Sequence, residues 1–255
     1  MFGMPLENFI FVGVLSFIAA AVDAIAGGGG LISLPAFMSI GIPIHLVMGS
    51  HKLASTISSV GSCIKFFTSG KMTTSLLKYL VPLNFLGACL GVYVLNMIDE
   101  KILEPLIIFL LFIMLIYTVV NKNIGLEDNF KGLNKKNIIA GCIMSTVIGF
   151  YNGFFGPGTG SFLLFAFIKI YGMDFVISTG NAKVLNLVGN FASLIMFIYY
   201  GNIEYTYALI FGAVMFFGGH CGAKLAISKG GKFVKPFFVI VTSITLAKMV
   251  ISKFF

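Results

Sequence analysis

Two lysines inside apolar stretches are the side chains in this sequence best suited to hold an anion. Lys52 and Lys183 each lie about seven residues from the start of such a stretch, where an ionisable side chain is costly and usually marks a pathway. Polar residues follow both lysines at spacings of three and seven, which places them on one helix face: Ser55, Ser59, Asn186 and Asn190. Two alternatives stay open. The lysines could snorkel toward a polar surface, and the serines and asparagines could only bond neighbouring helices.

Two glycine-rich segments interrupt apolar stretches and supply a second kind of anion-binding group. Four successive glycines make a poor helix interior, because each costs roughly 1 kcal/mol relative to alanine. A helix that starts after such a break presents unpaired N–H groups and the positive end of its dipole. We therefore expect short helices to begin at Leu31 and Ser161. The substrate-binding residues predicted at the two breaks are Gly28, Gly29, Gly30, Gly156, Gly158, Thr159, Gly160 and Ser161.

Three further polar residues beside these motifs are predicted to act in coupling or as counter-ions. Asp23 lies inside an apolar stretch, four residues before the first break, and Asn152 holds the corresponding place before the second. Asp23 could carry a proton or pair with Lys52 or Lys183, and pairing is the preferred interpretation. His51 could titrate near neutral pH, although a hydrogen-bonded bystander is preferred. The other histidines and the four cysteines lack metal-ligand spacing, so we expect no metal and no cofactor.

The elements that position these residues belong to an integral membrane protein. Hydrophobic residues make up 58% of the chain and charged residues 10%, against roughly 25% charged in soluble domains. The net charge of +8 is carried by lysine without any arginine, whereas nucleic-acid surfaces favour the planar guanidinium. We interpret this charge as loop topology and expect no nucleic-acid partner.

Hydropathy predicts an all-helical arrangement of spans. Apolar stretches near or above the roughly 18 residues that cross a bilayer predict eight long helices, at residues 8–26, 45–68, 79–98, 102–121, 137–155, 177–200, 205–223 and 234–253. Two shorter segments, 31–42 and 161–171, follow the glycine breaks and are expected to be half-helices that re-enter rather than cross. Irregular backbone survives at membrane depth only where protein buries it or where it lines a cavity.

The two halves of the chain, residues 1–128 and 129–255, are predicted to be repeats within one membrane domain. The two lysines and the polar residues that follow them match at a constant offset of 131. Lysine concentrates in cytoplasmic loops, and the acidic loop at 99–104 corresponds to the basic loop at 224–235. The second half is therefore expected to be inverted, an arrangement typical of transporters with broken helices.

Both glycine breaks lie in longer motifs that carry a family resemblance. The segments Asp23–Pro35 (DAIAGGGGLISLP) and Gly149–Ser161 (GFYNGFFGPGTGS), each followed by a lysine-bearing helix, resemble the two signatures of the TauE/SafE sulfite exporter family. The resemblance covers essentially the whole chain and implies a membrane protein that moves sulfite, sulfonates or related organic anions. This chain departs from the family at Asn152, where members often have Asp, and at His51, where they often have Asn or Thr.

These observations predict an all-α polytopic membrane protein of two inverted repeats, each of about four long transmembrane helices plus a half-helix. The predicted function is a secondary transporter that binds a small anion at mid-membrane between the broken helices and moves it by alternating access. An anion channel fits the same residues. An intramembrane enzyme fits poorly, because an aspartyl protease needs two membrane aspartates.

The expected location is the plasma or inner membrane of the cell, and the expected partners are the anion and the lipid bilayer. Coupling to a proton or another cation is left open, and no feature of the sequence predicts an oligomeric state.

Overall fold

The computed structural model describes residues 5–99, 102, 109, 130 and 132–229. The regular elements in this part of the chain are all helices: α1 (Leu6–Ala26), α2 (Gly30–Met38), α3 (Ile44–Thr68), α4 (Thr74–Leu95), α6 (Lys135–Phe154), α7 (Thr159–Tyr171), α8 (Phe175–Tyr199) and α9 (Tyr205–Lys229). Six of the eight expected long helices are therefore confirmed as helices. The other two, at 102–121 and 234–253, lie essentially outside the described residues.

The two short helices after the glycine breaks are also confirmed. α2 begins at Gly30 and α7 at Thr159, one and two residues earlier than the sequence predicts, because the last residues of each break already adopt helical backbone. α2 ends at Met38 instead of residue 42. Gly41 takes a φ of +83°, a left-handed value that a helix interior does not accept.

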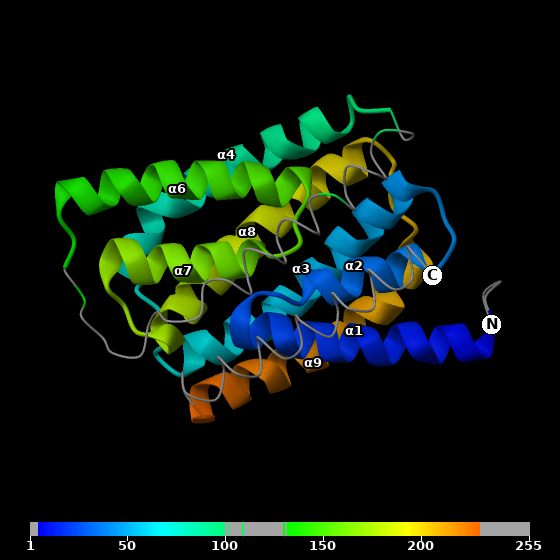
Figure 1. Cartoon of the computed structure of the whole chain (residues 1–255), viewed down its shortest axis with the longest axis horizontal. Helices are drawn as coiled ribbons and strands as arrows, with labels where there is room; N and C mark the ends of the chain where they lie inside the picture. Colours follow the sequence, from blue (N-terminus) through cyan, green and yellow to red (C-terminus); the bar gives the residue numbers. More distant parts are fainter. Residues whose placement is uncertain (1–4, 100–101, 103–108, 110–129, 131, 230–255) are drawn as a thin grey trace.

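The helices form three layers that lie roughly parallel to the long axis of the molecule (Figure 1). α1 packs with α9 at one edge, and α4 packs with α6 at the opposite edge. Between these pairs lie α3 and α8, which contact each other, together with the short helices α2 and α7. Each edge pair joins a helix from one half of the chain to a helix from the other half, so the two halves are interleaved.

Glycines let the edge pairs approach closely, and they do so in the same way at both edges. A methyl group added to Gly87 of α4 would lie 2.3 Å from the carbonyl oxygen of Thr146 in α6. A methyl group added to Gly218 of α9 would lie 2.4 Å from the carbonyl oxygen of Phe17 in α1. Small residues at helix contacts are how helices associate in a bilayer, where burial of apolar surface gives no driving force.

The outer surface of the bundle is apolar. Large hydrophobic side chains are exposed at helical spacing, such as Ile139, Ile143 and Val147 along α6, and exposure of this kind fits contact with lipid. Five of the described helices, α1, α4, α6, α8 and α9, are long and apolar enough to cross a membrane. α3 has 25 residues but is not among them, because its buried face carries serines, His51 and Lys52.

Matched contacts join the two halves near the ends of α3 and α8. The backbone N–H of Glu204, just before α9, donates to Ser50 Oγ in α3 at 2.8 Å. The backbone N–H of Thr73, just before α4, donates to Asn181 Oδ1 in α8 at 2.7 Å. At the offset of 131 residues Ser50 corresponds to Asn181, and Thr73 corresponds to Glu204. The same contact therefore occurs twice.

Candidate functional site

The two glycine breaks meet in the middle layer. A methyl group added to Gly27 would lie 2.1 Å from the carbonyl carbon of Gly160, and one added to Gly30 would lie 2.8 Å from Pro157 Cα. Ser161 Oγ donates to the carbonyl oxygen of Ala26 at 3.0 Å. The breaks therefore touch backbone to backbone, and no residue larger than glycine fits at the junction without displacement.

Local backbone conformation explains the sequence of each break. Gly27 caps the carboxyl end of α1 with a φ of +81°, and Gly156 and Gly158 take φ values of +98° and +80° after α6. Glycine reaches such values without the clash that a Cβ creates. The chain is thereby turned so that α2 and α7 begin at the junction. Contrary to the expectation of unpaired donors, the N–H groups of Leu31, Ile32, Thr159 and Ser161 donate to carbonyl oxygens of the breaks themselves.

Lys52 lies at this junction, on α3, with only 2% of its surface exposed. Its Nζ donates to the backbone carbonyl of Asn152, to Asn152 Oδ1 at 2.8 Å and to Asn190 Oδ1 at 3.4 Å. A methyl group added to Gly156 would lie 2.7 Å from the same Nζ. Neutral carbonyls satisfy the three ammonium donors, but no carboxylate in the described part of the chain neutralises the charge.

Lys183, at the corresponding place on α8, has a different environment. Its exposed fraction is 1%, and its Nζ forms an ion pair with Asp23 Oδ2 at 2.5 Å. Of the two lysines considered as partners for Asp23, the structure places Lys183 and not Lys52 at this contact. Asp23 is the more exposed partner, at 21%, so its carboxylate lies between the Lys183 ammonium and the pocket.

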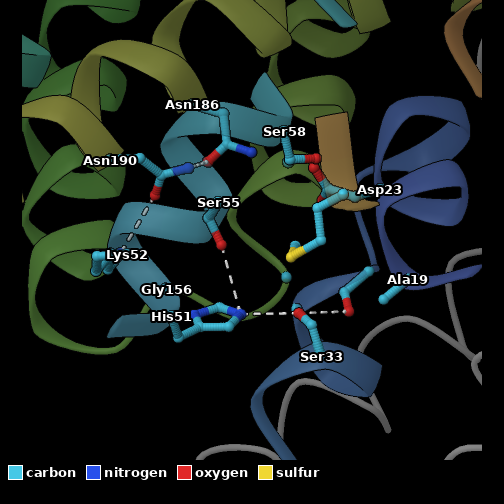
Figure 2. Close-up of a pocket in the computed structure, with 15 residues that line it drawn as sticks. Ala19, Asp23, Ser33, His51, Lys52, Ser55, Ser58, Gly156, Asn186 and Asn190 are labelled. Carbon is cyan, nitrogen blue, oxygen red and sulfur yellow. Dashed lines mark hydrogen bonds between the residues drawn. The ribbon is translucent and has the colours of Figure 1, made fainter. Parts of the chain in front are cut away.

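His51 joins α3 to α2. Its Nε2 lies 2.8 Å from Ser33 Oγ and 3.4 Å from Ser55 Oγ, and Ser33 Oγ also donates to the carbonyl of Gly29 at 3.2 Å. Figure 2 shows the imidazole between the two hydroxyl groups. The hydrogen-bonded role expected for His51 is thus present.

A pocket of about 30 Å³ lies among these groups, with room for about two water molecules. Three of its lining residues are ionisable: Asp23, His51 and Lys52. Asn190 links Lys52 to Asn186 at the edge of the pocket (Figure 2). The remaining lining residues are Ala19, Gly29, Gly30, Ser33, Ser55, Ser58, Gly156, Gly158, Gly160, Asn186, Asn190 and Met215. The pocket therefore combines one unneutralised cation, two helix amino ends and several hydroxyl and amide groups.

Several residues predicted to bind substrate do not line the pocket. Thr159 Oγ1 donates to Gly156 O at 2.6 Å, and the hydroxyl of Ser161 is used to hold α1. Lys183 contacts the lining residue Asp23, as Asn152, which was predicted for coupling, contacts Lys52. The last member of this group is Gly28, which is buried in the break and is not part of the lining.

Four lining residues were not predicted: Ala19, Ser33, Ser58 and Met215. Ser33 lies in the first glycine motif, four residues after Gly29, so helical spacing could have placed it beside the break. Ser58 follows Ser55 by three residues, and the same spacing argument applies to it. Ala19 and Met215 are apolar and carry no such signal. Across the residues described, no group of three or more His, Cys, Asp or Glu side chains could hold a metal ion.

Comparison with known proteins gives consistent matches over nearly the full chain. Residues 12–249 match the family model described as Sulfite exporter TauE/SafE. A "Probable membrane transporter protein" of Haemophilus influenzae is 32% identical over 248 residues, which cover 97% of this chain and 96% of the relative. The "Probable membrane transporter protein YfcA" of Escherichia coli K12 is 31% identical over 246 residues, covering 94% and 90%. No solved structure matches the chain.

Proposed function

Because the chain belongs to the TauE/SafE sulfite exporter family, a family of membrane transporters and not of enzymes, we propose that it carries small oxyanions such as sulfite or sulfonates. The family predicted from the two motifs is confirmed, and the chain is a multi-pass membrane protein with five candidate spans among the described residues. The proposal adds a substrate class, a site and a mechanism to that assignment.

The observation that carries the proposal is the state of Lys52. A buried ammonium group without a carboxylate partner is costly, because hydrogen bonds to amides replace only part of its hydration. The lysine lies on the wall of the pocket, beside Gly156. An anion that enters the pocket supplies the missing negative charge. Its electrostatic attraction to the ammonium group offsets the cost of burying that charge.

The contacts around Lys52 suggest how an oxyanion would be held. The bond to Asn190 Oδ1 is the longest of the three, at 3.4 Å, so an oxyanion oxygen can take its place at the least cost. The positive ends of the α2 and α7 dipoles also favour a negative charge here, and a further oxygen can accept from the hydroxyl of Ser55. Because glycines line both helix starts, an anion can approach the backbone closely.

Alternating access between two inverted repeats is the mechanism we propose. The pocket is lined by residues from both halves of the chain, so a movement of one half against the other would open it to alternate sides. Two matched capping contacts, from Glu204 to Ser50 and from Thr73 to Asn181, support an internal symmetry. Transporters of this kind move one repeat against the other around a fixed central site.

Within this proposal Asp23 serves as the counter-ion of Lys183, and His51 orients Ser33 and Ser55 around the pocket. Coupling to a proton or another cation through these groups stays a prediction. Asn152, which accepts two hydrogen bonds from Lys52, positions the ammonium group.

Replacing Lys52 tests the proposed site. Lys52→Met keeps a side chain of similar length and removes the charge, so binding of sulfite and methanesulfonate should weaken about tenfold to a hundredfold, or roughly 1 to 3 kcal/mol. The measurement is the ligand-induced shift in melting temperature in detergent. Lys136→Met, on the exposed start of α6, is the matched control and should bind as the wild type does.

Unchanged anion affinity in Lys52→Met would exclude the proposed site. Counterflow in proteoliposomes tests the mechanism separately, since a carrier exchanges labelled anion against an opposing gradient and a channel does not.

A further inference from the structure

The residue four positions before each glycine break is an acid in the first half of the chain and an amide in the second. Asp23 Oδ2 lies 2.5 Å from Lys183 Nζ, and Asn152 Oδ1 lies 2.8 Å from Lys52 Nζ. Both partners reach across from the other half of the chain, and both stand four residues before a glycine break. The acid cancels one lysine charge, whereas the amide leaves the other lysine charge uncancelled.

The formal charge around the pocket is therefore +1. Asp23 and Lys183 sum to zero, neutral His51 adds nothing, and Lys52 contributes the remaining charge. Among the described residues, no other ionisable side chain lines the pocket. One negative charge makes the assembly neutral, while a second would leave an uncompensated anion beside the Asp23 carboxylate.

We propose that the residues at positions 23 and 152 set the charge of the transported anion, and that one acid with one amide selects a monovalent anion. This inference rests on the proposed function. In a poorly hydrated site an uncompensated charge of either sign is unfavourable, so affinity depends on the match between anion charge and site charge. A second acid would weaken the binding of any anion, and two amides would favour a divalent anion.

Methanesulfonate and sulfate are a matched pair of probes for this inference. Both are tetrahedral, and a methyl group in one replaces an oxygen in the other, so they differ by one unit of charge at nearly equal size. Both keep their charge throughout the neutral pH range, so the charge difference between the probes is the same for every variant. The measured quantity is the ratio of the two dissociation constants, obtained by thermal shift or calorimetry on the full chain in detergent.

Single substitutions should move this ratio in a defined direction. Asp23→Asn frees the charge of Lys183, and we expect the ratio to shift toward sulfate by about tenfold or more. Asn152→Asp neutralises Lys52, and both anions should bind at least about tenfold more weakly. The difference in hydration between the two anions is the same for every variant, so it cancels when the ratios are compared.

A double variant that exchanges the acid and the amide distinguishes a charge effect from a simple loss of structure. Asp23→Asn combined with Asn152→Asp moves the acid from one lysine to the other and keeps the site at +1. We expect this double variant to keep the wild-type preference for methanesulfonate, with size-exclusion profiles and melting temperatures reported for all variants. Recovery of the preference would not follow from a merely structural role of either residue.

The outcomes separate this inference from the proposed function. If methanesulfonate binds the wild type but Asp23→Asn leaves the ratio unchanged, or if the double variant prefers sulfate, charge selection is wrong and the anion site stands. If neither methanesulfonate, sulfate nor sulfite binds the wild type, the proposed function fails and this inference fails with it.

Discussion

The surroundings of Lys52 and of Lys183 look alike in sequence and differ in chemistry. Both lysines are buried, lie at the same place on 25-residue helices and contact a residue four positions before a glycine break. One contact is an ion pair at 2.5 Å and the other a set of bonds to neutral carbonyls. Equal position therefore does not mean equal role. Lys183 is paired with a carboxylate, whereas Lys52 is bonded to neutral carbonyl groups.

The residues next to the two lysines also differ in polarity. His51 on α3 is replaced by Ala182 at the corresponding place on α8, and Ser33 on α2 is replaced by Phe162 on α7. Phe162 packs edge-on against Tyr151 with ring centroids 5.3 Å apart. The pocket beside Lys52 is thus lined by His51 and Ser33, and neither has a polar counterpart in the second half of the chain.

Removing the charge of Lys183 should have the largest effect on stability. Lys183→Met leaves the Asp23 carboxylate without its partner, and breaking a buried pair in this way costs about 3 to 5 kcal/mol. We expect a lower melting temperature and poorer expression than for Lys52→Met, which removes an uncompensated charge. The comparison assigns the counter-ion role to the pair of Asp23 with Lys183.

The double variant Lys183→Met with Asp23→Asn should recover most of the lost stability. If Lys52→Met proves the more destabilising of the two single changes, the assignment of the ion pair is wrong.

Disrupting the contact between the two glycine breaks should have the second-largest effect on stability. Gly27→Ala introduces a Cβ 2.1 Å from the backbone of Gly160 at a φ of +81°, and overpacking plus left-handed strain together cost roughly 2 to 5 kcal/mol. Both lysine sites adjoin this junction, so stability and anion affinity should fall together. Melting temperature and methanesulfonate binding are the two readouts.

Gly70→Ala is the matched control, because Gly70 has a φ of +65° and nothing within 4 Å of an added methyl group. Gly70→Ala introduces the left-handed backbone strain, about 1 to 2 kcal/mol, without overpacking. It should leave anion affinity unchanged. Equal losses in the two variants would show that the junction is not tightly packed.

Removing the Ser33 hydroxyl, which lies next to His51, should have the smallest effect on anion affinity. Ser33→Ala removes the 2.8 Å contact to His51 Nε2, and a single hydrogen bond contributes about 0.5 to 1.5 kcal/mol. We expect sulfite or methanesulfonate affinity to fall about twofold to tenfold, less than for Lys52→Met, with little change in melting temperature.

Thr68→Ala serves as the control, since this exposed hydroxyl on α3 bonds only within its own helix. A loss of affinity in Ser33→Ala that equals or exceeds that of Lys52→Met would mean that the hydroxyl, not the ammonium, dominates the site.

Much of the fold could be predicted because its causes are local. Apolar stretches mark the long helices, and the two glycine runs mark where helices stop and short ones begin. The motif around Gly156–Ser161 was specific enough to predict the family, which the comparisons confirm. Helix ends shifted by up to six residues, from residue 42 to Met38 in α2 and from residue 223 to Lys229 in α9, since helix ends depend on backbone conformation and packing as well as on hydropathy.

The candidate site could be predicted in part. Lys52, Ser55, Asn186, Asn190 and most of the glycines line the pocket as expected. Ser33 and Ser58 were missed, because a serine on an apolar helix has the same sequence signal whether it faces lipid, a neighbouring helix or a cavity. Ser161 points away from the pocket to Ala26, and only the position of α1 determines that contact.

The sequence by itself determined that this chain is a helical membrane protein of a transporter family, with two glycine-broken helices and two buried lysines. These properties follow from hydropathy, glycine conformation and motif, all of which act over a few residues. Only the tertiary structure decided which lysine receives the acid. Asp23 and Lys183 are 160 residues apart, and their pairing requires α1 and α8 to meet at the junction of the two breaks. Because an ion pair forms only over a few ångströms, the packing of distant helices decided which lysine is paired with a carboxylate.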